Sequence, residues 1–401
     1  MPTPGRKTVL PALLMAVVVA VPKCVTAANP STTSTAAHVF PPAITAQDVR
    51  PHIEFLAGDE QRGRFGADAQ HAARYLAEHF LRCQLKPLFE GSYYQLIPGK
   101  SAEPGQRVVL GHNVGGWCEG SDPALKNEFV IIGVHYDHLG VRDGETYAGA
   151  DDNASGCAMM LELAEQISRA ATKPKRSVVF VGFDLEEQML WGSRWFAAHP
   201  PWPLEQVRLF ITADMIGRSL GDLPLPVVFA MGSEHSPQVK LSLDRIGRPE
   251  GLEIARLGAD LVGTRSDYGP FRDRQVPFLF FSTGQHPDYH TPRDTPARID
   301  YEKAARVSSL ILQLVRDIAD TNEPPVWNSA TVTDLDEPRA LERITTLLLD
   351  TEQQQPLSDI QRYMVSTVRN RCRRILEADQ MTADDRTWLV RMSQLLLLSV
   401  F

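Results

Sequence analysis

The chain has 401 residues, of which 43% are hydrophobic and 22% are charged, a composition typical of a globular protein. Its 41 basic and 49 acidic residues give a net charge of −8 at pH 7. A nucleic-acid-binding protein would carry a clustered basic excess, so this balance argues against a nucleic-acid partner.

The N-terminal segment, residues 1–27, has the three-part layout of a secretory signal peptide. Two basic residues precede an apolar run over residues 9–21, and cleavage is expected after Ala27 or Ala28. The run is shorter than the roughly 20 residues that span a bilayer, so we expect an exported protein, periplasmic or secreted, without stable membrane insertion after cleavage. For the remaining cysteines we expect free buried thiols or one disulfide among Cys83, Cys118, Cys157 and Cys372.

Helices alternate with buried strands along the next part of the chain. Residues 28–43 form a lead-in rich in Ser, Thr, Ala and Pro, and residues 44–322 form the main domain. Apolar spacing predicts helices over 69–83, 156–167 and 190–198, and strands over 129–134, 177–183, 208–214 and 276–282. Strands that are apolar throughout indicate an α/β fold with a central, mostly parallel mixed sheet flanked by helices on both faces.

The C-terminal part of the chain has a different pattern. The segment Asn-Glu-Pro-Pro-Val over residues 322–326 interrupts the alternation of strands and helices. Residues 340–401 then show helical periodicity and no strand signal. We therefore expect a small helical extension over residues 323–401.

Acidic and imidazole side chains follow each of the four predicted strands. The first strand leads into His135-Tyr136-Asp137-His138, and a loop then carries Asp151 and Asp152; the later strands lead to Glu186 and Glu187, to Asp214, and to Tyr289 and His290. In an α/β sheet such residues gather at the carboxyl ends of the strands. Carboxylates and imidazoles that converge there without cysteine suit zinc or a similar divalent ion in an open, catalytic site.

Together these motifs resemble one family. The stretches HYDHLG, GADDNASG, DMIGR and YHTPRDT, with a Glu-Glu pair before Gly192-Ser193, are similar to those of the co-catalytic zinc aminopeptidases. This group includes the bacterial leucyl aminopeptidases and aminopeptidases S and Y, and is related to glutamate carboxypeptidase II and the transferrin receptor. The resemblance covers residues 44–321, including the opening segment FLAGDEQRGRFG, and implies a zinc-exopeptidase-like fold.

The resemblance implies a site for two zinc ions. Asp151 would be shared between the ions, and the full ligand set would be His135, Asp151, Glu187, Asp214 and His290. Three further side chains would serve catalysis: Glu186 as general base, Asp137 as the partner of the other His135 nitrogen, and Tyr289 beside the substrate carbonyl. A peptide bond of unusual geometry would follow the shared aspartate, between Asp151 and Asp152.

The function implied is that of a zinc-dependent aminopeptidase acting on peptides with a free N-terminus. A hydroxide bridging the two zinc ions would attack the scissile carbonyl, with Glu186 taking the proton of the water and returning it to the leaving amine. The sequence does not define the side-chain preference, the oligomeric state or the role of the C-terminal extension.

Related proteins with three other functions are alternatives to an aminopeptidase. A carboxypeptidase or amidohydrolase of the same group would need a cationic pocket, which Arg218, Arg265, Arg272 or Arg293 could supply. A non-catalytic receptor-like domain should have lost ligands or the base, and a single-zinc cyclising enzyme similar to glutaminyl cyclase is disfavoured by His135. His138 and His286, which lie close to ligands in sequence, are expected at the pocket rim.

Overall fold

The computed structural model describes residues 38–99, 108–330, 334–351 and 356–400. The predicted signal peptide and most of the predicted lead-in lie outside these residues, so export stays a prediction. Within the described residues, no helix combines the length and the apolar content that crossing a bilayer requires.

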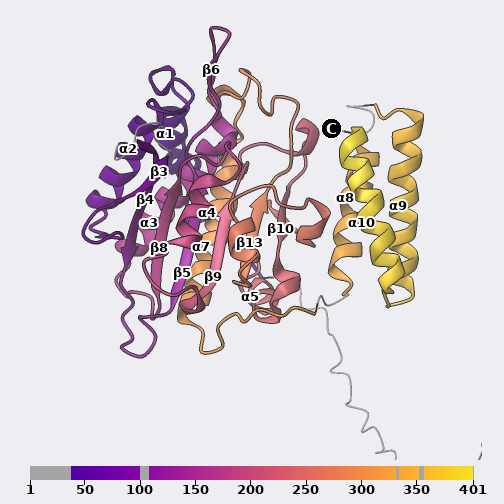
Figure 1. Cartoon of the computed structure of the whole chain (residues 1–401). Coiled ribbons are helices and arrows are strands. Elements are labelled where there is room, and N and C mark those ends of the chain that lie inside the picture. Colours follow the sequence, from indigo (N-terminus) through magenta and orange to yellow (C-terminus); the bar gives the residue numbers. More distant parts are fainter. Residues whose placement is uncertain (1–37, 100–107, 331–333, 352–355, 401) are drawn as a thin grey trace, which may run out of the picture. The chain divides into compact units, whose positions relative to one another are not determined.

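The described residues form a nine-stranded mixed sheet (Figure 1). In spatial order its strands are β12 (Glu253–Leu257), β10 (Val227–Met231), β13 (Phe278–Ser282), β9 (Val207–Ala213), β5 (Phe129–His135), β8 (Ser177–Phe183), β4 (Val108–Cys118) and β2 (Lys86–Pro87), with β3 (Tyr94–Gly99) also paired to β4. The four central strands β13, β9, β5 and β8 run parallel. Their carboxyl ends therefore meet at one edge of the sheet.

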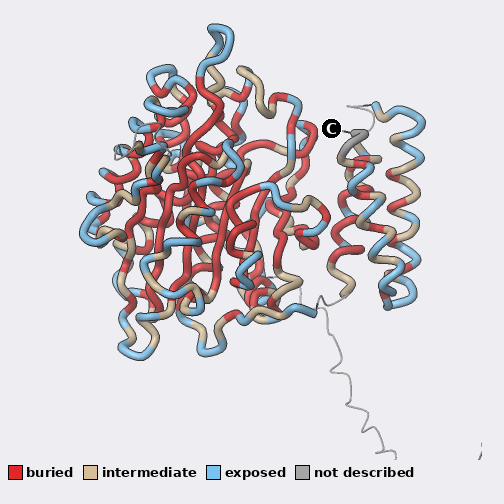
Figure 2. Tube along the Cα trace, viewed as in Figure 1, coloured by how far each residue is buried: buried red, intermediate tan, exposed pale blue. Residues whose placement is uncertain are grey.

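Helices cover both faces of this sheet, as the sequence predicts. One face packs against α1 (Ala46–Leu56), α2 (Ala69–Arg82), α3 (Gly156–Ser168), α5 (Pro237–Ile246) and α7 (Tyr301–Asp320). The other packs against α4 (Trp191–Ala198), α6 (Gly269–Arg272) and the C-terminal helices. Successive β5 residues contribute to opposite faces, Ile131 to one cluster and Ile132 to the other. Figure 2 shows the resulting buried strands between more exposed outer helix faces.

The predicted C-terminal extension is helical. It consists of α8 (Asp336–Asp350), α9 (Asp359–Glu377) and α10 (Ala383–Val400), which we call the helical trio. Buried apolar residues of the trio join the same core cluster as the side chains of β10, β12 and β13. The described residues lie in one compact unit, Ala37–Phe401, so the division into two domains stays a prediction.

The predicted lead-in contains ordered structure. Strand β1 (Val39–Phe40) pairs in parallel with β11 (Arg248–Pro249). This contact joins segments about two hundred residues apart, so local composition gave no sign of it. The two short strands β6 (Gly140–Arg142) and β7 (Glu145–Tyr147) form a separate hairpin.

The four cysteines of the predicted mature chain are free thiols, and all of them are buried. The sequence is compatible with this state and with a single disulfide, and the structure shows the thiols. Burial raises the pKa of Cys157 and Cys372 to about 12, which keeps both thiols protonated at neutral pH.

Candidate metal centre

The carboxyl ends of the parallel strands bring the predicted ligands together. His135 is the last residue of β5, and Asp214 directly follows β9. Glu187 lies in the turn after β8, and His290 lies in the loop after β13. Four segments that are distant in sequence thus deliver imidazole and carboxylate groups to one edge of the sheet.

The first ligand group consists of His135, Asp152 and Asp214, all buried. Nε2 of His135 lies 3.4 Å from Oδ1 of Asp152 and 3.6 Å from Oδ2 of Asp214. The same nitrogen has no hydrogen-bond partner. A buried imidazole nitrogen that faces two carboxylates without bonding to either fits a cation shared by all three.

The second ligand group consists of His138, Asp152 and Glu187, and His290 lies against its two carboxylates. Nε2 of His290 lies 3.2 Å from Oδ2 of Asp152 and 3.3 Å from Oε2 of Glu187. Nδ1 of His138 lies 2.8 Å from Oε1 of Glu187 and 3.8 Å from the same Asp152 oxygen. The two groups therefore share Asp152, one carboxylate oxygen facing each.

Asp151 lies outside both groups, although the sequence places it as the shared ligand. Its Oδ1 accepts a 2.6 Å hydrogen bond from the N–H of Gly217, and its Oδ2 lies 3.5 Å from Nε2 of His286. The neighbouring Asp152 takes the predicted position. The cis peptide bond is shifted by the same single residue, to Asp152–Asn153 instead of Asp151–Asp152. Two consecutive aspartates in an irregular loop point to different sides, and a motif alone does not say which one faces inward.

Asp137 positions the Glu-Glu pair as well as His135. Its carboxylate accepts the backbone N–H groups of Glu186 at 3.0 Å and Glu187 at 3.3 Å. Oδ1 lies 3.7 Å from Nδ1 of His135, and the backbone carbonyl of Asp137 lies closer, at 3.2 Å. The side chain therefore connects the ends of β5 and β8 across the site.

Glu186 and Tyr289 line a cavity of about 480 Å³ together with Asp152, Asp214 and His290. Burial raises the pKa of Glu186 well above its usual value, and the His135 imidazole opposes this shift. The Tyr289 ring stacks on His290, with ring centroids 3.8 Å apart. A carboxyl with a raised pKa and a phenol thus share one cavity with both ligand groups, which is an arrangement suited to proton transfer.

Comparison with known proteins identifies the family of this chain. The family model for peptidase family M28 matches residues 113–315, which is half of the chain. The chain belongs to peptidase family M28. The matched stretch holds both ligand groups and ends before the helical trio.

Individual relatives of this M28 chain are distant. Leupeptin-inactivating enzyme 1 of Streptomyces exfoliatus is 26% identical over 63% of the chain and 52% of that protein. Glutaminyl-peptide cyclotransferase of Boiga irregularis is 27% identical over 47% of the chain and 61% of that protein. The Legionella pneumophila LapA aminopeptidase structure has a TM-score of 0.55 and 19% identity, over 70% of the chain and 73% of that structure. The matched part of the chain spans less than two thirds of the length of these two curated relatives.

In the M28 site the charges favour the ionised forms of Asp152 and Glu187, whereas burial raises the pKa of Asp214. Burial opposes charge on Asp152, but the His138 imidazole holds the pKa of this carboxyl well below its usual value. Despite burial and the Asp152 charge, His138 and His290 lower the pKa of Glu187 to about 2. Burial likewise opposes the charge of His290, while Asp152 and Glu187 raise its pKa to about 10. Both carboxylates are therefore the hard anionic oxygen donors that a divalent cation needs.

His138 and His286 are buried in the structure, whereas the sequence suggests rim positions. His138 faces Glu187 and Asp152. His286 faces Asp151 from behind the metal centre. Neither forms part of an exposed rim, because the loops that carry them fold inward against the strand ends.

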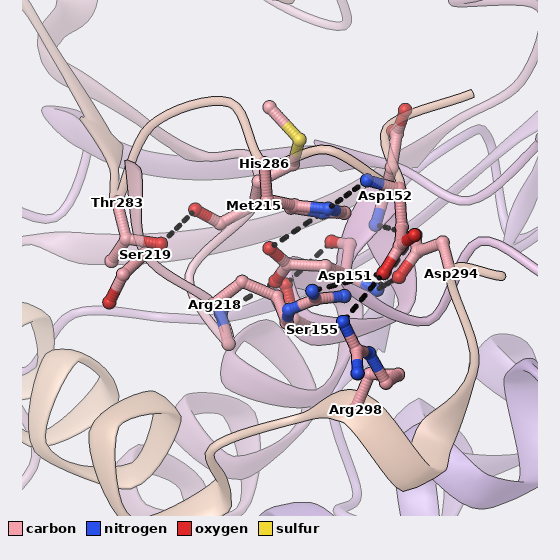
Figure 3. A network of polar contacts seen from close by, with 12 residues as sticks. Asp151, Asp152, Ser155, Met215, Arg218, Ser219, Thr283, His286, Asp294 and Arg298 are labelled. Atoms are coloured by element: carbon pink, nitrogen blue, oxygen red, sulfur yellow. Dashed lines mark hydrogen bonds and ion pairs between the residues drawn. The ribbon is translucent and has the colours of Figure 1, made fainter. Parts of the chain in front are cut away.

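A network behind the metal centre holds three loops of the M28 site in place (Figure 3). The carboxylate of Asp294 accepts the backbone N–H groups of Asp151 at 3.0 Å and Asp152 at 3.1 Å. The Asp151 carboxylate accepts the backbone N–H of Gly217, in the segment after β9. The backbone carbonyl of Asp151 accepts a 2.7 Å hydrogen bond from the Ser155 hydroxyl. The sequence motifs include Asp294 but gave it no role, because its partners are backbone groups.

Arg64 is a second positioning residue that the sequence did not reveal. It lies in the opening segment of the resemblance, and its side chain is fully buried. Its guanidinium donates hydrogen bonds of 2.6 to 3.3 Å to five backbone carbonyls, those of Leu56, Tyr136, Ala148, Gly149 and Asp152. One cation therefore joins α1, the end of β5 and the loop of the shared aspartate.

Replacing Arg64 with Lys should lower the free energy of unfolding by about 3–5 kcal/mol, because an ammonium cannot reach the same carbonyls and leaves several unpaired. The measurement is the midpoint of urea unfolding. The matched control is Arg62→Lys at an exposed neighbouring position, where a change within about 0.5 kcal/mol is expected. Equal midpoints for the two variants would contradict the role of Arg64.

Proposed function

We propose that the chain is a zinc-dependent aminopeptidase that removes N-terminal residues from peptides with a free amino group. The observation that carries this proposal is the pair of ligand groups that share Asp152. Membership of the M28 family and the similarity to aminopeptidase structures support it. Peptide substrates and the position of cleavage belong to the proposal.

The proposed zinc ligands are His135, Asp152 and Asp214 for one ion, and Asp152, Glu187 and His290 for the other. The unpartnered Nε2 of His135 and the mixed oxygen and nitrogen donors fit this metal. When bound, the two ions supply Lewis acidity and lower the pKa of a water toward 7. His138 donates its Nδ1 proton to Glu187 and orients that carboxylate.

The remaining steps use side chains of this chain. Glu186 accepts the proton of the attacking water and returns it to the leaving amine, a role that its raised pKa favours. The Tyr289 hydroxyl donates to the substrate carbonyl oxygen as negative charge develops there. The acidic side chains that line the cavity are Asp152, Glu186 and Asp214. Their negative charge attracts the free α-amino group of a peptide, which favours cleavage at the first peptide bond.

The test is a comparison of free and blocked dipeptides before and after removal of metal. We expect turnover of dipeptides with a free amino group, loss of that turnover after dialysis against a chelator, and its return with zinc. The same dipeptides with an acetylated amino group should react at least about tenfold more slowly. Unchanged activity in the stripped protein would refute the metal-dependent mechanism.

A second candidate, carboxypeptidase or amidohydrolase, is favoured by one observation. Of the four arginines that could bind a substrate carboxylate, three are already paired with carboxylates: Arg218, Arg272 and Arg293. Arg265 instead donates to the Val262 carbonyl at 3.3 Å and lines the cavity. Faster cleavage of the acetylated dipeptides than of the free ones would favour this candidate.

A receptor-like domain and a cyclising enzyme have less support. A receptor-like domain would not need the complete ligand groups or the buried Glu186. A cyclising enzyme with one zinc, although a cyclotransferase is among the relatives, would not need the group formed by His135, Asp152 and Asp214.

A further inference from the structure

The cavity at the metal centre extends well beyond the ligand groups. Its volume of about 480 Å³ falls within the range of about 300–1,000 Å³ for pockets that hold drug-sized ligands. From the ligand side it continues past Met215 and Leu220 to an apolar floor formed by Phe229, Met231, Leu257 and Phe280 on β10, β12 and β13. A single leucine side chain would leave much of this space unfilled.

The far wall of the cavity comes from the helical trio. Leu341, Ile344, Thr345 and Leu348 follow the i, i+3, i+4, i+7 spacing of one α8 face, and all four line the cavity. The rest of this wall is Val368 of α9 and four residues of α10: Ser393, Gln394, Leu396 and Leu397. Most of the residues that the trio contributes are apolar and none is charged, so this end of the cavity suits an uncharged, largely apolar group.

Polar contacts join α10 to Asp260, which lies in the short segment after β12. Both terminal nitrogens of Arg386 bond to the Asp260 carboxylate at 2.8 Å, and its Nε lies 3.0 Å from Glu337. The side chain of Gln394 donates to the Asp260 carbonyl at 3.1 Å. The Glu337 contact lies within the trio and joins α10 to α8, and Arg343 of α8 pairs with Glu253 of β12 at 2.8 Å. Both α8 and α10 are therefore joined to the part of the chain around β12.

We propose that the helical trio makes this enzyme selective for N-terminal residues with long apolar side chains, which extend from the metal centre to α8. The proposal rests on the aminopeptidase function above. The trio lies beyond the residues that match the family model, so this selectivity is a property of this chain's own extension. A short side chain would bind at the metal centre but leave the wall uncontacted.

The first measurement is kcat/KM for aminoacyl anilides with linear side chains, from alanine through norleucine to 2-aminodecanoic acid. Each methylene buried in an apolar site should raise kcat/KM by about fourfold until the chain reaches α8. A flat profile, or one that falls beyond norleucine, would overturn the proposal and leave the aminopeptidase function intact.

The second measurement uses a matched pair of variants on α8. Thr345→Trp fills the far end of the cavity, whereas Thr346→Trp places the same ring one residue away, outside the lining. We expect Thr345→Trp to lower kcat/KM for the 2-aminodecanoyl anilide at least tenfold and to leave the alanyl anilide within about twofold. Thr346→Trp should change neither. If Thr345→Trp does not fold, Val368→Phe obstructs the same space from α9.

Calorimetric binding of free 2-aminodecanoic acid separates failure of this proposal from failure of the proposed function. We expect saturable binding to the wild type, weakened at least tenfold in Thr345→Trp, with alanine bound equally by both. If no anilide is cleaved but this binding pattern holds, the cavity assignment stands and the aminopeptidase function falls. If the anilides are cleaved but Thr345→Trp and the wild type do not differ, the cavity assignment falls.

Discussion

Replacing Glu186 with Gln should leave zinc content unchanged and slow peptide hydrolysis by about 10²- to 10⁴-fold, the usual contribution of a positioned acid–base group. The amide has the shape of the carboxyl, and the backbone N–H of residue 186 still donates to Asp137. The amide cannot, however, accept and return a proton. The measurements are metal analysis of the purified variant and kcat on a free dipeptide.

The matched control for this substitution is Glu145→Gln on the exposed hairpin strand β7. It makes the same chemical change at an exposed residue that belongs to neither ligand group and does not line the cavity, and we expect wild-type kcat. A Glu186→Gln enzyme with near-normal turnover would show that another group serves as the base. A variant that also loses zinc would instead show that Glu186 helps to hold the ions.

Replacing Asp152 with Asn should remove bound zinc and activity together, whereas Asp151→Asn should keep both. Asp152 belongs to both ligand groups, so its charge would attract both ions. Loss of a residue that only supports a ligand lowers metal affinity by up to about 10²-fold, and we expect the affinity for zinc to fall further here. Burial and the nearby Asp294 raise the pKa of Asp151 to about 8. An amide at this position therefore removes a charge that burial and Asp294 already disfavour.

The measurements for this pair are zinc per chain after dialysis, the thermal midpoint with and without added zinc, and kcat/KM. Zinc should raise the midpoint of the wild type and of Asp151→Asn, and leave that of Asp152→Asn unchanged, because only a protein that binds the ion gains stability from it. The reverse pattern, with zinc lost from Asp151→Asn alone, would restore the assignment that the sequence motif favours.

The sheet could be predicted from the sequence because its strands are apolar on both faces. The strand predicted over residues 177–183 coincides with β8, and the strand predicted over 129–134 is one residue shorter than β5. Uninterrupted apolar runs of this length, separated by helices, are typical of parallel strands covered on both sides. The positions of His135 and Asp214 at strand ends followed from the same pattern.

The parts of the site that the sequence missed depend on backbone partners and on long-range contacts. Arg64 and Asp294 bind carbonyl and N–H groups, which every residue has, so no spacing pattern announces them. The choice between Asp151 and Asp152 depends on how one loop turns. The contact of the helical trio with the cavity joins residues that are distant in sequence, such as Phe229 and Leu341. Helical periodicity shows only that such a face needs a partner.

The position of α8 has a consequence for how the chain can be shortened. Strand β12 is the last strand on its side of the described sheet, and an edge of this kind offers unpaired backbone groups to other chains. Ala340 and Ile344 of α8 lie against this strand, and Arg343 pairs with Glu253 at 2.8 Å. A chain that ended before α8 would leave uncovered the part of β12 that α8 contacts, together with the apolar floor beside it. Such a fragment should self-associate, so the trio serves colloidal stability as well as the shape of the pocket.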